Sequence, residues 1–358
     1  MLLVEIVKVL APATVAFAIG IAITPIVTHY LYKHSAWKKK AGKDQGLGGG
    51  GTPIFNELHK EKEVGTPRFG GIVVWGSVLL TSLFFFALAY VTNNQTLDML
   101  SFLSRSQTWV PLGALLIGAI VGFVDDFFEV VGHKDNLAGG LSLRKRILVV
   151  AFVALACAWW FYDKLEVSSI MIPFMGPLEL GWVFIPLFVL IALGVYAGGV
   201  IDGLDGLAGG VFASIFAAYA GIAFLQTQLD LAALSATIAG ALLAFVWFNI
   251  PPARFYLSET GTMGLTLALT VIAFSTDTLG EGVGVVVLPI IAFLLVVTVA
   301  SVLLQVMSKQ FFGKKIFHVA PLHHHFEAIG WPAYKVTMRY WVISVIVAIL
   351  GITVAVIG

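Results

Sequence analysis

The 358-residue sequence contains little charge: Asp, Glu, Lys and Arg make up 11% of the residues, whereas 59% are apolar. Soluble domains average about 25% charged residues, so this chain has too little polar surface to form a water-soluble globule. The composition excludes most soluble enzymes, nucleic-acid-binding proteins and disordered scaffolds, and it predicts a polytopic membrane protein. Cysteine is also scarce, and the single Cys157 excludes an intramolecular disulfide and a cysteine-based metal site.

Ten apolar runs can serve as membrane helices, which need about 20 mainly apolar residues. The runs are continuous rather than alternating, which favours helices over a transmembrane barrel. The predicted fold class is therefore all-α, with one transmembrane domain of about ten helices covering residues 1–358. The eighth run is short and is open to extension into the polar residues after it. The predicted spans are 9–32, 71–92, 108–124, 147–162, 182–201, 207–226, 229–248, 263–275, 286–308 and 337–358.

The basic residues predict the orientation of these spans. An even number of spans puts both termini on one side of the membrane and assigns every loop to a side. Of the 21 Lys and Arg residues, 18 fall in or beside the loops that follow odd-numbered spans. Because basic loops remain in the cytoplasm, this face is predicted to be cytoplasmic and both termini outside. The predicted cytoplasmic loops are 33–70, 125–146, 202–206, 249–262 and 309–336.

Most acidic residues gather on the same predicted face. Carboxylates beside hydrocarbon are costly and mark function or a paired network, although Asp is also a good helix cap at an interface. Adjacent carboxylates favour a shared proton or a cation between them, and several oxygens without cysteine suit Mg²⁺ together with phosphate oxygens. The pattern indicates phosphate chemistry at the membrane surface. The acids after the third, fifth and seventh spans are Asp125 and Asp126, Asp202 and Asp205, and Glu259.

Three consecutive histidines occupy residues 323–325 in the last predicted cytoplasmic loop. Neighbouring side chains diverge from a regular element, and the spacing lacks the His-x₃-His pattern of zinc sites, so one shared metal ion is disfavoured. With Lys314, Lys315 and His318 close in sequence, the loop is expected to hydrogen-bond an anionic ligand. A solvated basic loop that contacts lipid head groups is the alternative.

Taken together, the motifs resemble the phospho-N-acetylmuramoyl-pentapeptide transferase family, within the superfamily of polyprenyl-phosphate N-acetylhexosamine-1-phosphate transferases. The similarity extends from GTPRFGG (65–71) to the last span. The block APLHHHFE (320–327) is the most specific, because transferases of related pathways have a different histidine pattern there. The aspartate motifs alone indicate only the superfamily. The other matching stretches are GFVDD (122–126), GLSLRKR (140–146), IDGLDGLA (201–208) and WFN (247–249).

The resemblance implies a ten-helix enzyme of the bacterial inner membrane, with both termini outside and a cytoplasmic active site. The implied reaction moves phospho-MurNAc-pentapeptide from its UDP carrier to undecaprenyl phosphate, giving lipid I and UMP, with Mg²⁺ as cofactor. The family also implies a homodimer. A sister transferase that loads another UDP-N-acetylhexosamine is the nearer alternative. A transporter or flippase is more distant, since the acids lie at span ends and the sequence shows no internal repeat.

Roles for individual residues follow from the same resemblance. Asp125, Asp126 and Asp202 are implied as catalytic, the first two at the lipid phosphate. Glu259 and Asp202 are implied as metal ligands. The implied substrate-binding residues are Asp205 near the nucleoside, Asn249 and Tyr256 at the uridine pocket, and Arg146, His323, His324 and His325.

Several positions depart from the family pattern. Glu259 replaces the aspartate implied as the main magnesium ligand and is one methylene longer. Glu129 and Val64 stand where the family has basic residues. These departures lie near the predicted polar pocket and bear on substrate fit. The others are Arg146 in place of lysine, and Tyr196 and Gly199 in place of two asparagines.

The predicted chemistry is direct in-line attack by an oxygen of the lipid phosphate, with Asp125 or Asp126 accepting or excluding its proton. A covalent aspartyl-phosphate is the competing mechanism. Direct attack is favoured because a phosphate monoester is mostly ionised at neutral pH.

Overall fold

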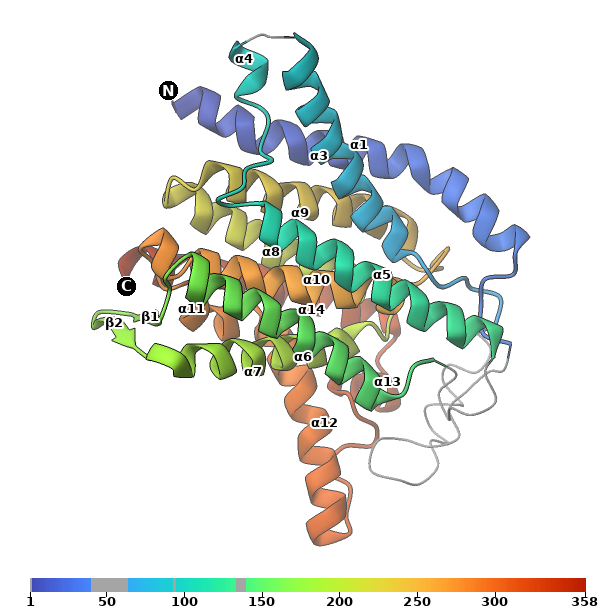
Figure 1. Cartoon of the computed structure of the whole chain (residues 1–358). Helices are drawn as coiled ribbons and strands as arrows, with labels where there is room; N and C mark the ends of the chain where they lie inside the picture. Colours follow the sequence, from blue (N-terminus) through green and yellow to red (C-terminus); the bar gives the residue numbers. More distant parts are fainter. Residues whose placement is uncertain (1, 40–63, 93–94, 133–139) are drawn as a thin grey trace.

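A computed structural model describes residues 2–39, 64–92, 95–132 and 140–358. Residues 40–63 and 133–139, which belong to the first two predicted cytoplasmic loops, lie outside the described residues. The described chain is a bundle of helices with one short antiparallel hairpin (Figure 1). The predicted all-α class is confirmed.

The elements run in the following order. The first half contains α1 (Leu2–Lys33), α3 (Gly71–Thr92), α4 (Gln95–Asp98), α5 (Trp109–Val131), α6 (Leu143–Trp159), the π-helical turn η1 (Trp160–Lys164), β1 (Ser169–Ile172) and β2 (Gly176–Glu179). The second half contains η2 (Gly181–Val183), α7 (Phe184–Ala197), η3 (Gly198–Ile201), α8 (Leu207–Leu225), α9 (Leu229–Asn249), α10 (Ser258–Ser275), η4 (Thr278–Gly280), α11 (Gly284–Ile291), α12 (Phe293–Phe312), α13 (Leu322–Ala328) and α14 (Ala333–Ile357).

Eight helical segments of the described chain are long and apolar enough to cross a membrane: α1, α3, α6 with η1, α7 with η2 and η3, α8, α9, α12 and α14. The third and eighth predicted spans correspond to α5 and α10, which are not among those eight. The chain is thus a multi-pass membrane protein, while the count of ten spans and the cytoplasmic orientation stay predictions. Both termini lie at the same end of the bundle, as an even number of crossings requires (Figure 1).

The eighth predicted span is the central helix of the bundle. Every residue of α10 except Glu259 is buried. Its threonines remain compatible with this interior because Thr266 and Thr270 donate their hydroxyl hydrogens to carbonyls one turn earlier, at 2.8 and 2.9 Å. The sequence left open an extension of this span into the polar residues after 275, and this was wrong. The helix begins earlier, at Ser258, and thereby brings the polar segment 258–262 into its first turns.

Glycine allows α5 to approach α10 closely. A Cβ at Gly122 would collide with the backbone carbonyl of Glu259, and a Cβ at Gly118 would lie 2.8 Å from Gly264 Cα. Small residues at such a spacing let two helix backbones meet, which is how membrane helices pack without a hydrophobic driving force. The contact places the last turns of α5, with Asp125 and Asp126, beside the first turn of α10.

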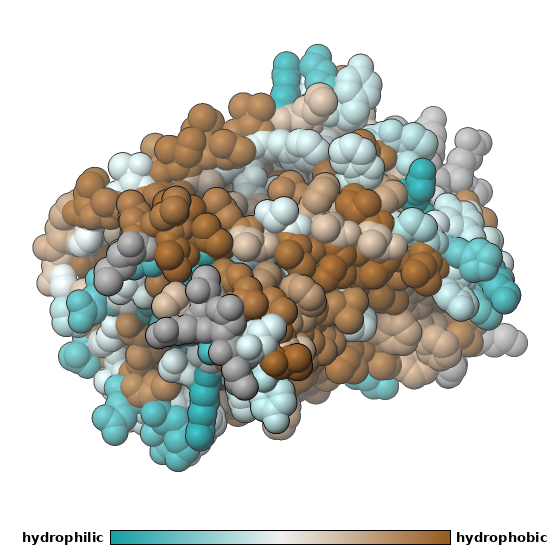
Figure 2. All heavy atoms as spheres, turned by 90° about the horizontal axis from the view of Figure 1, so that it is seen from above, coloured by the Kyte–Doolittle hydropathy of each residue, from teal (hydrophilic) through white to brown (hydrophobic). Residues whose placement is uncertain are grey.

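Two further parts of the fold differ from expectation. The ninth predicted span, 286–308, is broken at Ala292 into α11 and α12, and α12 projects away from the bundle (Figure 1). The hairpin β1–β2, with Ser169 opposite Glu179, was not predicted. In the view of Figure 2 the middle of the surface is mainly hydrophobic and hydrophilic residues concentrate at its margins, as expected for a chain surrounded by lipid.

Candidate functional site at the start of helix α10

Two of the predicted carboxylates accept hydrogen bonds from the first turn of α10. Asp202 Oδ2 accepts a hydrogen bond from the Ser258 amide at 2.8 Å. Asp126 Oδ2 accepts bonds from the Thr260 amide at 2.8 Å and from the Thr260 hydroxyl at 2.6 Å. The first amides of a helix lack partners within it, so they are natural donors to carboxylates. Ser258 has a φ of 56°, an uncommon value for a residue other than glycine, which marks strain where the chain enters the site.

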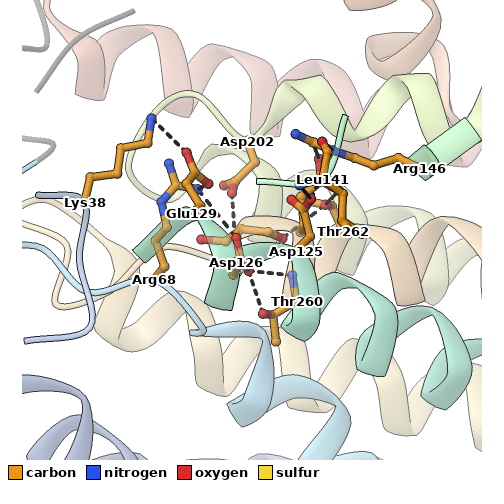
Figure 3. Close-up of polar contacts among 12 residues, drawn as sticks. Lys38, Arg68, Asp125, Asp126, Glu129, Leu141, Arg146, Asp202, Thr260 and Thr262 are labelled. Carbon is orange, nitrogen blue, oxygen red and sulfur yellow. Dashed lines mark hydrogen bonds and ion pairs between the residues drawn. The ribbon is translucent and has the colours of Figure 1, made fainter. Parts of the chain in front are cut away.

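Arg146 joins Asp125 to Glu259 on one side of this turn, and Figure 3 shows Arg146 beside Asp125. Its Nε lies 3.2 Å from Asp125 Oδ1, and its Nη1 lies 2.7 Å from Glu259 Oε1. Asp125 Oδ1 also accepts the Leu141 amide at 2.6 Å. We call Arg146, Asp125 and Glu259 the Arg146 cluster. The structure therefore brings together one predicted substrate-binding residue, one predicted catalytic residue and one predicted metal ligand.

A second group of charged residues lies on the other side of Asp126. The sequence analysis did not predict these residues as part of the site. Arg68 Nη1 is 2.8 Å from Glu129 Oε2 and 3.6 Å from Asp126 Oδ1. Lys38 Nζ is 3.0 Å from Glu129 Oε1 (Figure 3). We call Arg68, Glu129 and Lys38 the Arg68 cluster. Two signals were available, since Arg68 lies within GTPRFGG and Glu129 follows Asp126 by three residues on one helix face.

Asp202 lies in the loop between η3 and α8. Burial raises its pKa to about 6, while the hydrogen bond from the Ser258 amide and the charge of Arg68 act in the opposite direction. Nearby carboxylates at Glu259 and Asp205 add to the rise. A carboxyl group with such a pKa is close to its charge transition at neutral pH, which is typical of functional sites.

A cavity of about 350 Å³ adjoins the loop 202–206. Asp205 and Tyr256, both predicted to bind the nucleoside, line it together with Val64, one of the departures from the family. The predicted uridine residue Asn249 lies behind this cavity and is 2% exposed. Its side chain accepts the Gly206 amide at 2.9 Å and donates to the Phe255 carbonyl at 2.7 Å. It therefore ties the two loops of the cavity together.

The histidine triplet divides between two directions. His323 and His324 are buried against the loop 202–206, where a Cβ at Gly203 would collide with the His323 ring and come within 2.8 Å of the His324 ring. His324 Nδ1 is 2.8 Å from Glu327 Oε2. His325 instead stacks on His318, with ring centroids 5.5 Å apart. The structure thus brings two of the three histidines to the acidic loop and turns the third toward the preceding loop.

The residues are of the types that bind magnesium, but they do not form a complete metal site by themselves. Among the described residues, no three His, Cys, Asp or Glu side chains are grouped to hold a metal ion. Asp125 Oδ2 and Asp126 Oδ1 are buried with no hydrogen-bond partner in the described part of the chain. Mg²⁺ commonly binds one or two carboxylates and takes its other ligands from water and phosphate. The donor set suits that arrangement and no softer metal.

Proteins of known family are similar to this chain over most of its length. Residues 108–277 match the model of glycosyl transferase family 4. The chain is 31% identical over 348 residues to a phospho-N-acetylmuramoyl-pentapeptide-transferase of Anoxybacillus flavithermus, covering 96% of this chain and 97% of that protein. The proteins of that name from Bacillus anthracis and Bacillus subtilis are 32% identical over 354 residues and 33% identical over 299 residues. These alignments cover 97% and 82% of this chain, and 98% and 84% of the relatives.

Proposed function

The chain belongs to the phospho-N-acetylmuramoyl-pentapeptide-transferase family, and from this premise we propose that it transfers phospho-MurNAc-pentapeptide from UDP to undecaprenyl phosphate, giving lipid I and UMP. The observation that carries the proposal is that Asp126 and Asp202 bond the start of α10 and that Arg146 links Asp125 to Glu259 in the same turn, at one end of a membrane bundle. Its proposed place is the bacterial inner membrane, where both the lipid acceptor and the bilayer are available.

In the proposed reaction an oxygen of the lipid phosphate attacks the sugar-linked phosphorus of the diphosphate. A P–O bond to the lipid phosphate forms as the P–O bond to UMP breaks, and UMP leaves with the bonding electrons. Such a transfer needs positioning and charge stabilisation and no protein nucleophile. Asp125 and Asp126 would orient the lipid phosphate and take its residual proton, since each has a buried oxygen outside the hydrogen bonds described.

Asp202 and Glu259 would hold Mg²⁺, which when bound supplies positive charge to the diphosphate. Arg146 fixes the direction of the Glu259 carboxylate through the 2.7 Å contact. The Ser258 amide does the same for Asp202. These contacts keep both carboxylates at the start of α10, where a diphosphate would lie between the lipid phosphate and the nucleoside.

The nucleoside is assigned to the cavity lined by Asp205 and Tyr256. The Tyr256 ring would stack on uracil, and Asp205 would accept hydrogen bonds from the nucleoside. Asn249 acts in this proposal by holding the cavity loops in place. His323 and His324 would donate hydrogen bonds to a phosphate or sugar oxygen across the loop 202–206, and His325 would contact substrate from the side of the preceding loop, where it stacks on His318.

The test is an assay of the purified protein in detergent with undecaprenyl phosphate, Mg²⁺ and either UDP-MurNAc-pentapeptide or UDP-GlcNAc. We expect release of UMP with the first nucleotide only. Release with UDP-GlcNAc alone would assign the chain to the sister transferases. Incubation of the protein with nucleotide substrate carrying a labelled β-phosphate, without lipid, should leave the protein unlabelled; a stably labelled aspartate would replace direct attack by the covalent route. The predicted homodimer is tested by the mass of the protein–detergent particle.

A further inference from the structure

Arg68 lies at the centre of the site rather than at its edge. Its side chain is 19% exposed and contacts two acids on successive turns of α5, Asp126 and Glu129. Its charge also acts on Asp202 and on Tyr256, which come from the loop 202–206 and from the segment before α10. Arg68 thus lies beside the carboxylates of α5, two residues after Thr66, which lines the cavity together with Tyr256.

The backbone holds Arg68 in this place from both sides. The Arg68 amide donates to the Ala36 carbonyl at 2.8 Å. On the other side Tyr256 donates its amide to the Pro67 carbonyl at 2.9 Å and accepts the Gly70 amide at 2.8 Å. The next residue, Phe69, has a φ of 70°, which is unfavourable for a bulky side chain. Backbone strain of this kind persists where the surroundings impose one conformation.

The Arg68 cluster contains two cations, Arg68 and Lys38, and one anion, Glu129. Lys38 and Glu129 form an ion pair at 3.0 Å with side chains that are 10% and 11% exposed, so Lys38 offsets the charge of Glu129. Arg68 also pairs with Glu129, at 2.8 Å, and its Nη1 lies 3.6 Å from Asp126 Oδ1, a distance too long for a hydrogen bond. The other buried guanidinium, that of Arg146, already contacts both Asp125 and Glu259.

A site rich in carboxylates repels a diphosphate unless a cation in the site offsets their negative charge. We propose that Arg68 binds the diphosphate of the nucleotide-sugar and that Glu129, itself held by Lys38, positions its guanidinium. Arginine suits this role because its planar group presents paired N–H donors that match two phosphate oxygens. The assignment rests on the proposed function, because it takes a nucleoside diphosphate as the ligand. It identifies a substrate-binding residue that the resemblance did not imply.

The test compares binding of UDP and of uridine to the full-length protein in detergent with Mg²⁺, by calorimetry. Arg68→Ala should weaken UDP binding about 10- to 100-fold and leave uridine binding unchanged, because only UDP carries the diphosphate. Arg68→Lys should lie between, since it keeps the charge and loses the planar donors. Arg339→Ala, which removes a cation stacked on Trp331 outside the site, is the matched control and should change neither affinity.

Glu129 is tested by a double-mutant cycle. Glu129→Gln should weaken UDP binding about 3- to 10-fold in the wild-type background and have no effect in the Arg68→Ala background, because its effect passes through Arg68. A structural role would change uridine and UDP binding together and would persist in both backgrounds. Unchanged UDP affinity in Arg68→Ala, or equal loss of UDP and uridine binding, overturns the assignment. Failure of the wild type to turn over UDP-MurNAc-pentapeptide while UDP binding still depends on Arg68 overturns only the proposed reaction.

Discussion

Buried carboxylates lie at both ends of the bundle, and the two ends use their oxygens differently. At the end that carries the termini, Asp277 accepts the Met171 amide on Oδ1 at 2.7 Å and the Val285 amide on Oδ2 at 2.9 Å. At the opposite end, Asp125 Oδ2 and Asp126 Oδ1 are buried without a hydrogen-bond partner among the described residues. A buried acceptor left in this state costs about 1–3 kcal/mol. Asp277 therefore stabilises the fold, whereas Asp125 and Asp126 each keep one oxygen available for a ligand.

The site carboxylates are nevertheless oriented by hydrogen bonds to their other oxygen. Asp125, Asp126 and Asp202 each accept one backbone amide, at 2.6, 2.8 and 2.8 Å. One oxygen therefore fixes the direction of the side chain and the second is left for chemistry. This division is the physical meaning of preorganisation at this site, because the charge is in place before substrate arrives.

The largest expected effect is on turnover. Asp126→Asn removes the charge while keeping an acceptor for Thr260, so kcat should fall roughly 10²- to 10³-fold with little change in melting temperature. The matched variant Asp277→Asn should keep kcat within about twofold. UMP release and scanning fluorimetry in detergent measure the two quantities. Equal loss of kcat in both variants would remove the distinction between the two ends.

A large effect on stability is expected from Asp277→Ala. The change leaves the buried amides of Met171 and Val285 without their acceptor, at a cost of about 1–3 kcal/mol each in the free energy of unfolding. The unfolding midpoint should fall, while kcat per folded molecule stays near that of the wild type. A midpoint equal to that of the wild type would contradict the structural role of Asp277.

A combined effect is expected where α5 meets α10. Gly122→Ala inserts a methyl group against the Glu259 carbonyl, so the helices must separate at a cost of about 1–3 kcal/mol, and Glu259 must move with the backbone. Both the melting temperature and kcat should fall. Gly113→Ala, on the same helix with open space at its Cβ, is the control and should alter neither. A fall in stability with kcat intact would show that the site tolerates movement of α10.

The smallest expected effect is a pH dependence of stability. Burial raises the pKa of Asp277 to about 6, despite the opposing hydrogen bonds from Val285 and Met171. An unfolded Asp titrates near 3.9, so the folded state binds its proton more strongly. The stability that Asp277 contributes by holding this proton is complete below about pH 4 and is lost as pH rises through about 6. The unfolding midpoint of the wild type relative to Asp277→Asn should therefore be higher at pH 4.5 than at pH 7. A difference that does not vary with pH would contradict the raised pKa.

The sequence predicts the strongly apolar helices well, including the buried α8 and α9, and the more polar interior helix α10 less well. Runs such as 71–92 are apolar because they face lipid, and the structure has α3 over the same residues. Helix α10 faces other helices instead, so its threonines can bond to its own backbone and its hydropathy is weak. The break at Ala292 was not foreseen because the residues on both sides of it are apolar.

The candidate site shows a similar limit. Asp125, Asp126, Asp202 and Glu259 could be placed on one face from span order, because polar residues beside hydrocarbon need a reason. Arg68 was not predicted, because its place in GTPRFGG does not show its partners until Asp126 and Glu129 are seen within reach. Long-range pairing of this kind depends on packing rather than on local pattern.

Helix α10 connects the two carboxylate networks along a single axis. It starts at Ser258 within the site and ends at Ser275, two residues before Asp277. Its 18 residues span about 27 Å, close to the thickness of a bilayer core. A sliding movement of α10 along its axis would break the bonds to Asp277 at one end and those to Asp126 and Asp202 at the other. The position of α10 along its axis is thus fixed from both ends, so the bonds at the site keep the reacting groups in place even when Asp277 is lost.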